Sequence, residues 1–320
     1  MKSILITGGA GFIGSNLIKN LLPSSDFKII CFDNFDDFYS KEQKLLNIKQ
    51  FHDADNFSFI EGDICHPEDL DRLQKVDVII HLAAKAGVRS SIENADLYHN
   101  VNVFGTKNLL EFAKNRKVEQ FIFASSGSVY GLNKHFPWNE NESPLPISPY
   151  SLTKLSGEMM GHVYSHLYKI RFISLRLFTV YGPGQRPDLA IHKFFNAILE
   201  NKTITIFGNG TTQRDYTYVD DIVKGIISSI AYNKTLFEII NLGNHSTISL
   251  LDLIKEIEEQ CLKKAKIVRL PEQPGDVPNT FADISKARKL LGYNPSTQLH
   301  HGLKNFLNWY YCHRGIKIIR

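Results

Sequence analysis

The sequence has few cysteines, and they lie far apart. The four, Cys31, Cys65, Cys261 and Cys312, form no Cys-x-x-Cys pair among the 320 residues. Zinc sites and disulfide-rich domains both need cysteines in closely spaced sets. The spacing therefore argues against a metal site and against a disulfide framework, and it is typical of buried or incidental thiols in a reducing compartment.

Long apolar segments are also missing. Residues 1–16, MKSILITGGAGFIGSN, contain one short apolar run that glycines interrupt, with no cleavage-site pattern after it. A membrane-spanning helix needs about 20 consecutive apolar residues, and a secretory signal needs an apolar core followed by small residues. We therefore expect no signal peptide, no membrane partner and a cytoplasmic location.

A basic stripe is likewise absent. The net charge is only +4, and the lysines and arginines are scattered along the chain. Proteins that bind nucleic acids gather these residues on one face. The composition thus indicates no nucleic-acid partner, whereas a mildly basic balance suits an anionic small molecule.

The chain does contain a regular alternation of strand-like and helix-like segments. Its composition, 43% hydrophobic and 22% charged, is that of a soluble globular protein, and its length fits one large α/β domain or two unequal domains. Helical patterns such as 12–22 and 100–116 separate short apolar runs, and this alternation predicts a doubly wound parallel sheet covered by helices on both faces. The apolar runs are ILIT (4–7), KIICF (28–32), FSFIEG (57–62), VDVIIHLA (76–83), QFIFAS (120–125) and RFISLRLF (171–178).

The alternation of strand-like and helix-like segments becomes less regular after residue 178, where proline and glycine become frequent. A helical pattern at 220–231 and a strand pattern at 236–242 still suit the main sheet. We therefore predict two parts. Residues 1–178 plus 217–247 form a nucleotide-binding domain, and residues 179–216 plus 248–320 form a smaller lobe.

A glycine-rich loop follows the first predicted strand. TGGAGFIGS (7–15) places Gly8, Gly11 and Gly14 between a strand and a helix, where a tight turn and helix amides receive a pyrophosphate. Asp33 ends the next strand, where its carboxylate is expected to accept a hydrogen bond from a ribose 2′-hydroxyl. No arginine follows it to bind a 2′-phosphate, so NAD is favoured over NADP. The plain alternative is a turn aspartate. Asp63, after the third strand, is either an adenine contact or an ordinary strand-end residue.

The segment SPYSLTKLSGE (148–158) is open to two interpretations. Ser148 and Pro149 form a common helix start, which places Tyr150 and Lys154 on one helix face. A second Tyr-x-x-x-Lys match, at residues 130–134, contains glycine and asparagine and favours a turn. The spacing alone therefore fits either a plain helix start or a catalytic tyrosine–lysine pair.

The ordered set of motifs resembles the extended short-chain dehydrogenases/reductases that act on nucleotide sugars. Within this NAD-dependent epimerase/dehydratase family, the chain is most similar to UDP-glucuronate 4-epimerases and to the related UDP-glucose and UDP-N-acetylglucosamine 4-epimerases. The similarity extends to LKNFLNWY (303–310). Besides the glycine loop, the motifs are HLAAKAGVRSS (81–91), SSGSVYG (125–131), SPYSLTK (148–154), RLFTVYGP (176–183), QRDYTYVDD (213–221) and QPGDVPNTFAD (273–283).

The resemblance implies a Rossmann-type domain that holds NAD, a smaller C-terminal lobe that holds a UDP-sugar, and a homodimer. It assigns further cofactor contacts by position in the motifs. They are Phe12, Ile13, Asn34, Ile64, Leu82, Ala83 and Ala84, together with Tyr150 and Lys154.

The resemblance also assigns catalytic roles. Tyr150 matches the catalytic base and Lys154 its partner, while Ser126 matches the residue that hydrogen-bonds the sugar O4. An isolated phenol with a pKa of about 10 is a poor base at neutral pH, and a nearby ammonium together with the positive nicotinamide ring favours the phenolate. Ser128 lies on the same segment and is expected to reach the substrate.

The implied reaction is inversion at C4. The dehydratases of this family carry an Asp-Glu pair directly after the triad threonine, and here those positions are Gly127 and Ser128, neither of which serves as an acid or base near neutral pH. Epimerisation through a transient 4-keto sugar, with NAD kept bound, is the leading hypothesis. An NAD-dependent 4-reductase or decarboxylase and a non-catalytic nucleotide-sugar binder are the alternatives.

Three residues match UDP-binding positions of the family. Arg214 is expected to bind a phosphate, since arginine offers bidentate donors. Phe207 is expected to contact the uracil, and Asp276 the nucleoside ribose.

The residues expected around the sugar favour two different substrates. Thr179 and Arg186 match the uronate enzymes, in which hydroxyl donors and an arginine suit a C6 carboxylate, although Gly127 stands where those enzymes usually have serine. Thr280 is small and leaves room for an N-acetyl group at C2. The preferred substrate pair is therefore UDP-glucuronate and UDP-galacturonate, and UDP-N-acetylglucosamine and UDP-glucose remain alternatives.

Overall fold

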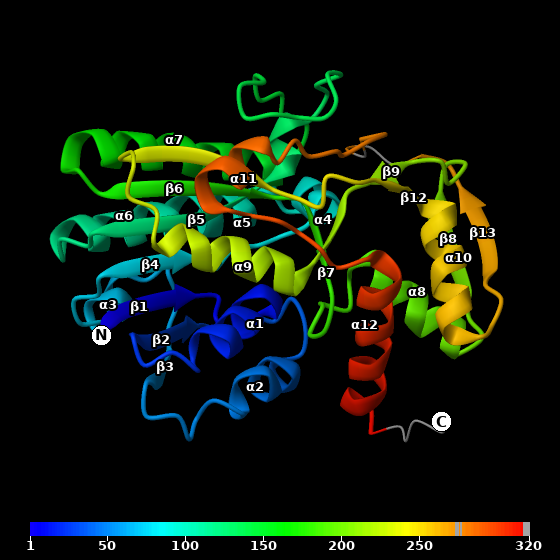
Figure 1. The fold of residues 1–320 in the computed structure, drawn as a ribbon, viewed down its shortest axis with the longest axis horizontal. Coiled ribbons are helices and arrows are strands. Elements are labelled where there is room, and N and C mark those ends of the chain that lie inside the picture. Colours follow the sequence, from blue (N-terminus) through cyan, green and yellow to red (C-terminus); the bar gives the residue numbers. More distant parts are fainter. Residues whose placement is uncertain (273–274, 276, 316–320) are drawn as a thin grey trace.

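The fold is built on a seven-stranded parallel sheet (Figure 1). It was obtained as a computed structural model that describes residues 1–272, 275 and 277–315. The sheet strands are β1 (Lys2–Thr7), β2 (Phe27–Asp33), β3 (Phe57–Glu61), β4 (Val78–His81), β5 (Gln120–Ser126), β6 (Arg171–Leu177) and β11 (Phe237–Leu242). Asp276, for which we predict a ribose contact, lies outside the described residues.

The strand order makes the sheet doubly wound. It runs β11-β6-β5-β4-β1-β2-β3, and all neighbours are parallel. The chain therefore starts in the middle, moves to one edge and then returns to build the other. In such sheets the ligand crevice lies beyond the carboxyl ends of the strands where the order reverses, which here is between β1 and β4. The predicted α/β fold is confirmed.

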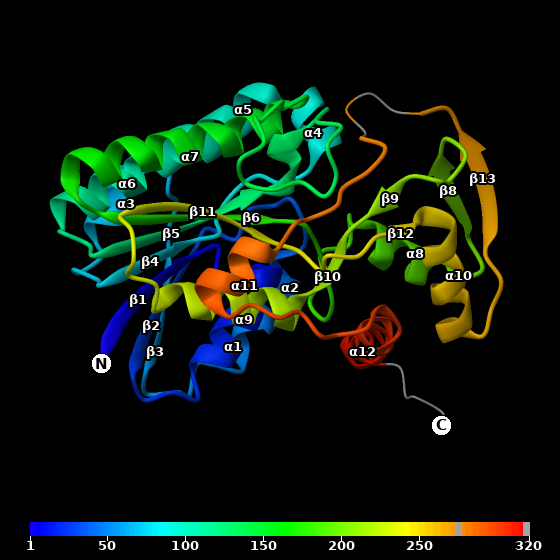
Figure 2. The same cartoon turned by 45° about the horizontal axis from the view of Figure 1, so that its top comes forward.

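Helices cover both faces of the sheet (Figures 1 and 2). Along β1, Ile4 and Ile6 join the core under α1 and α9, and Leu5 joins the core under α3 and α6. This burial on both faces explains why the strands read as continuous apolar runs. The helices on this part of the chain are α1 (Phe12–Leu21), α2 (Lys41–Lys49), α3 (Pro67–Asp71), α4 (Val88–Glu93), α5 (Ala95–His99), the π-helix η1 (Asn100–Gly105), α6 (Thr106–Asn115), the 3-10 helix η2 (Gly127–Tyr130), α7 (Pro149–Tyr168), α9 (Val219–Ile230) and α11 (Ser285–Leu291).

The remaining elements form short sheets and three helices. Parallel pairs form between β8 and β13 and between β7 and β10, and β9 pairs with β12 in the antiparallel sense. Both views place β8, β13, α8 and α10 together at one end of the molecule (Figures 1 and 2). These elements are β7 (Thr179–Tyr181), α8 (Ala190–Leu199), β8 (Thr203–Phe207), β9 (Gln213–Arg214), β10 (Tyr216–Tyr218), β12 (Ile248–Ser249), α10 (Leu250–Cys261), β13 (Lys266–Leu270) and α12 (Leu299–His313).

One helix lies elsewhere than the predicted division placed it. The prediction assigned residues 248–320 to the smaller lobe, but α11 packs against α9 and the edge strand β11 of the large sheet (Figure 1). Ile284 and Ala287 are fully buried in the core on that side. Burying these apolar side chains returns the chain to the first domain, a long-range contact that local sequence patterns do not reveal.

Within the described ranges, no helix combines the length and apolar character needed to cross a membrane. The described side chains also include no group of three or more His, Cys, Asp or Glu residues placed to hold a metal ion. All four cysteines are free thiols.

Candidate active site

A cavity of about 680 Å³ opens at the carboxyl ends of the central strands, between the large sheet and the smaller lobe. Nearly all of the predicted site residues line it. They are Gly8, Gly11, Phe12, Ile13, Gly14, Asp33, Asn34, Asp63, Ile64, Leu82, Ala83, Ala84, Ser126, Ser128, Tyr150, Lys154, Thr179, Arg186, Arg214 and Thr280.

The glycine loop has the shape that a phosphate site needs. Gly8 has a φ of +70°, and a Cβ there would lie 2.7 Å from the backbone nitrogen of Ala83, so only glycine fits. Gly11 caps α1 without a side-chain hydrogen bond, and the first turn of α1 contains no acidic residue. The first amides of this ten-residue helix therefore face the cavity without a side-chain competitor, which favours an anion.

Asp33 is fixed at the end of β2. Its Oδ2 accepts a hydrogen bond from the backbone N–H of Ala10 at 3.0 Å, and its Oδ1 accepts one from Phe35 at 2.9 Å. Burial raises the pKa of Asp33, while these hydrogen bonds act in the opposite direction. The carboxylate is thus held beside the glycine loop, where a ribose hydroxyl has a ready acceptor.

Asp63 and Asn34 form a second polar pair in the cavity wall. Asn34 Nδ2 donates to Asp63 Oδ2 at 2.8 Å, and the backbone N–H of Cys65 donates to Asp63 Oδ1 at 2.7 Å. Burial acts to raise the pKa of Asp63, but these bonds outweigh it, and the pKa is lowered. Together with the glycine loop and Asp33, this donor and acceptor set fits a dinucleotide.

Two cavity lysines were missed by the sequence prediction. Lys85 Nζ lies 2.7 Å from Asp36 Oδ2, and Lys44 Nζ donates to the backbone oxygen of Asp36. Lys85 lies within the motif HLAAKAGVRSS, so its position was available as a signal. The pairing of Lys85 with Asp36 could not be predicted from the sequence, because 49 residues separate them along the chain.

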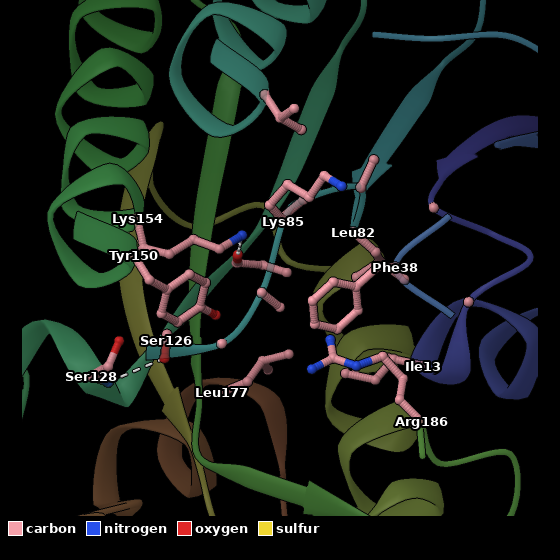
Figure 3. Close-up of a pocket in the computed structure, with 18 of the residues that line it drawn as sticks. Ile13, Phe38, Leu82, Lys85, Ser126, Ser128, Tyr150, Lys154, Leu177 and Arg186 are labelled. Carbon is pink, nitrogen blue, oxygen red and sulfur yellow. Dashed lines mark hydrogen bonds between the residues drawn. The ribbon is translucent and has the colours of Figure 1, made fainter. Parts of the chain in front are cut away.

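Helix α7 begins as the sequence predicts. The Ser148 and Ser151 side chains form a reciprocal capping box, and Pro149 occupies the first turn. Tyr150 and Lys154 then project from the same helix toward the end of β5, where Ser126 lies (Figure 3). The geometry thus brings the predicted catalytic residues together, whereas Tyr130 is fully buried and its hydroxyl donates to Asn241 Oδ1 at 2.8 Å.

The electrostatics of the tyrosine–lysine pair differ from the simple expectation. Lys154 is 5% exposed, its Nζ donates to the backbone oxygen of Ala124 at 2.8 Å, and burial lowers its pKa to about 8. Burial also raises the pKa of Tyr150, while a hydrogen bond with Ser126 and the charge of Arg186 act to lower it. In this structure Ser126 and Arg186, rather than Lys154, are the groups that favour the phenolate.

Two serines line the cavity here, Ser126 at the end of β5 and Ser128 in η2. Ser126 Oγ accepts a hydrogen bond from the backbone N–H of Ser128 at 3.1 Å. Ser128 Oγ is buried and has no hydrogen-bond partner among the described residues. A buried hydroxyl without a partner is costly, so this atom is well placed to bond a polar group of a ligand.

The substrate end of the cavity is formed mainly by the lobe. Arg186 makes a bidentate pair with Asp188, at 2.9 Å for both bonds, and its guanidinium lies 5.3 Å from the Phe38 ring (Figure 3). The Thr280 Oγ1 accepts from the backbone N–H of Asp215 at 3.2 Å. Arg214 Nη1 donates to the backbone oxygens of Gln213 and Pro278.

Phe207 does not join the other predicted residues. It ends β8, and among the described residues it is not part of the cavity lining. The guanidinium carbon of Arg89, on α4, lies 4.4 Å from its ring centre. The predicted contact between Phe207 and the uracil therefore stays a prediction, and the cation–π contact links α4 of the large domain to the lobe.

Comparisons with known proteins agree with this geometry. The model of the family described as GDP-mannose 4,6 dehydratase matches residues 5–306. The UDP-glucuronate 4-epimerase of Thermodesulfobacterium geofontis (strain OPF15) is 40% identical over 315 residues, which cover 97% of this chain and 96% of the relative.

Solved structures of epimerases are similar over nearly the whole chain. A crystal structure of UDP-glucuronic acid 4-epimerase from Bacillus cereus, in complex with UDP-glucuronic acid and NAD, has a TM-score of 0.93 and 40% identity, covering 97% of this chain and 99% of that one. The UDP-N-acetylglucosamine 4-epimerase of Methanobrevibacter ruminantium M1, in complex with UDP-N-acetylmuramic acid, has a TM-score of 0.89 and 29% identity, covering 98% and 99%.

The buried charge of Lys154 predicts a pH-dependent stability. Because the pKa of Lys154 falls from 10.5 to about 8 on folding, the unfolded chain binds more protons between these values and stability rises with pH across that window. Relative to Lys154→Met, the wild-type free energy of unfolding should gain about 2–3 kcal/mol between pH 7.5 and pH 10, as measured by urea denaturation. The exposed Lys134→Met is the control, and parallel curves for wild type and Lys154→Met would contradict the assignment.

Proposed function

The chain belongs to the family described as GDP-mannose 4,6 dehydratase, within the extended short-chain dehydrogenases/reductases, and we propose that it is an NAD-dependent UDP-sugar 4-epimerase that prefers UDP-glucuronate and UDP-galacturonate. One observation carries the proposal. A single cavity joins a dinucleotide-binding loop to Ser126, Tyr150 and Lys154, and Gly127 and Ser128 line the same cavity.

The residues after Ser126 argue against dehydration. In the dehydratases that this chain resembles, an acid and a base directly follow the triad threonine, whereas Gly127 and Ser128 at these positions supply neither. Space at position 127 is also limited, since a Cβ there would lie 3.1 Å from the Phe178 ring. An aspartate at this position would require the buried Phe178 to move. Oxidation and reduction at C4 then remain as the reaction that the site supports.

The chain's own residues would handle the proton. NAD, when bound, supplies a hydride acceptor and donor for C4, and the glycine loop, Asp33 and Lys154 would hold it. Tyr150 takes the proton from the sugar O4 and later returns it, while Ser126 hydrogen-bonds the same oxygen. Lys154, with a pKa of about 8, is mostly protonated at pH 7, and Ser126 and Arg186 are the groups that favour the Tyr150 phenolate.

The preference for a uronate rests on Arg186 and Thr179. Asp188 accepts hydrogen bonds from Nε and Nη2 of Arg186. The other N–H groups of this guanidinium remain as donors for a C6 carboxylate. The Bacillus cereus relative, which contains UDP-glucuronic acid, supports this substrate class. Thr280, which lines the cavity and is small, favours the second candidate, UDP-N-acetylglucosamine, and the Methanobrevibacter relative is named for that sugar.

Each of the two predicted parts of the chain is proposed to hold a different ligand. We propose that residues 1–178 plus 217–247 hold NAD and that residues 179–216 plus 248–320, apart from α11, hold the UDP moiety. Arg214, which lines the cavity from β9, would bind the diphosphate, for which a guanidinium is well suited.

The outer face of α7 suggests a homodimer. Four apolar side chains on this helix are about half exposed or more, namely Leu152, Met159, Val163 and Leu167. They recur at helical spacing along the 20-residue helix, which lies at the surface (Figure 2). A self-complementary stripe of this kind suits a two-fold interface with a second copy of the chain.

Tyr150→Phe tests the proposed chemistry. Removing the base should lower kcat by about 10²- to 10⁴-fold and leave the dissociation constant of the UDP-sugar within about threefold, because the ring still fills its place. Turnover is measured by proton NMR and binding by calorimetry. Tyr130→Phe, from the second Tyr-x-x-x-Lys match, should keep near-normal turnover, and an unimpaired Tyr150→Phe enzyme would remove the tyrosine from the mechanism.

Arg186→Met tests the uronate preference. The loss of a charged hydrogen bond to the C6 carboxylate should raise KM for UDP-glucuronate about tenfold or more, with KM for UDP-glucose within twofold. Steady-state kinetics with both sugars provides the comparison. Arg72→Met, an exposed arginine near α3, is the control, and equal KM changes for both sugars would contradict a carboxylate-specific role.

Met159→Lys combined with Val163→Lys tests the dimer. Two buried charges in an apolar interface are strongly unfavourable, so light scattering should show the mass falling from twice 36.4 kDa to a single 36.4 kDa chain. Leu262→Lys, at an exposed leucine after α10, should leave the mass unchanged. A monomeric wild type, or a variant that stays dimeric, would exclude this face.

A further inference from the structure

A buried carboxylate follows Tyr150 and Lys154 at the same helical spacing on the inner face of α7. Glu158 lies one helical turn beyond Lys154, so the three residues share one side of the helix. Its side chain is fully buried, with no exposed surface. Glu158 is not part of the cavity lining, so it does not reach the reacting atoms directly.

Glu158 is bonded to both strands that lie under α7. Its Oε1 accepts a hydrogen bond from Ser125 Oγ at 2.5 Å and another from Arg176 Nε at 2.9 Å, while Oε2 accepts from Arg176 Nη2 at 2.7 Å. Ser125 belongs to β5 and Arg176 to β6. The bidentate pair has the planar geometry that fixes direction as well as distance.

The network lies directly beneath the candidate catalytic residues. Ser125 and Arg176 are paired in the β5–β6 register, and the next pair up is Ser126 with Leu177. The Arg176 guanidinium carbon also lies 4.7 Å from the ring centre of Tyr130, in η2, which directly follows Ser126. Ser125, which the network holds, is therefore the residue directly before Ser126 in β5.

Stability alone gives a weak reason for such a network. The free energy that two charges lose when they are removed from water is about as large as the free energy of their attraction. Proteins in which apolar residues of similar volume replace such a pair are often as stable or more stable. Its geometric effect is more specific, because it ties the helix that carries Tyr150 and Lys154 to the strand end that carries Ser126. Small displacements at a reacting centre have large effects on rate.

We propose that Glu158 and Arg176 are positioning residues, which act through Ser125 to set the place of Ser126 relative to Tyr150 and Lys154. The effect on rate rests on the proposed epimerase function. The effect on geometry does not, because it concerns the fold of the protein alone.

The decisive variant is Glu158→Met with Arg176→Met, which removes both charges together and keeps unbranched side chains in the core. We expect a folded protein by circular dichroism, with kcat lowered about tenfold or more and KM for the UDP-sugar within about threefold. A crystal structure should show Ser126 displaced relative to Tyr150 by about 0.5 Å or more. A purely structural pair would lower the melting temperature and leave both readouts unchanged.

A matched control uses the ion pair of Lys286 and Glu238, joined at 2.6 Å between Nζ and Oε1 on the edge of the same sheet. The same double replacement by methionine there should leave kcat and the position of Ser126 unchanged. Ser125→Ala provides a milder variant that keeps the ion pair and removes only its link to β5. It should lower kcat about threefold or more without loss of folding.

The outcomes separate the two proposals. The positioning role would be overturned if the wild type turns over and the Glu158→Met, Arg176→Met variant folds, keeps a kcat within twofold of wild type and shows no displacement of Ser126. If the double variant does not fold, the Ser125→Ala variant provides the test. A kcat equal to that of the wild type in Ser125→Ala would then overturn the positioning role. Absence of wild-type turnover on any UDP-sugar would remove the proposed function, and the position of Ser126 in the variant structure would still decide the geometric claim.

Discussion

The close packing of α7 on β5 and β6 is the constraint on which the rest of the site depends. A Cβ at Gly157 would lie 2.3 Å from the Phe123 ring, and one at Gly161 would lie 2.1 Å from the Phe172 ring. These aromatic rings sit in a dense core and have little room to move. The helix is therefore held at a fixed distance from the sheet, and this distance places Tyr150 and Lys154 beside the end of β5.

Close packing also shifts the pKa values of Tyr150 and Lys154, because it buries much of both side chains. Lys154 contacts the Ala124 carbonyl under the helix, and burial lowers its pKa to about 8. The same burial raises the pKa of Tyr150, against a hydrogen bond from Ser126 and the charge of Arg186. A buried charge is tolerated only with partners, and for Lys154 the Ala124 carbonyl is such a partner.

Much of the fold was predictable because its signals are local. Parallel strands buried on both faces read as apolar runs, and Ser148 with Pro149 marks the start of α7. The partners of charged side chains were not predictable, since Lys85 pairs with Asp36 and Glu158 with Arg176 only after folding. The return of α11 to the large sheet and the contact of Phe207 with Arg89 likewise depend on long-range packing.

The most direct test of C4 epimerisation is proton NMR of the purified protein with UDP-glucuronate, UDP-N-acetylglucosamine and UDP-glucose in separate samples, without an added reductant. The anomeric proton signals distinguish each sugar from its C4 epimer. We expect UDP-galacturonate to form from UDP-glucuronate with no net consumption of a reductant. No inversion at C4 in any of the three samples would contradict the assignment of the protein as a UDP-sugar 4-epimerase.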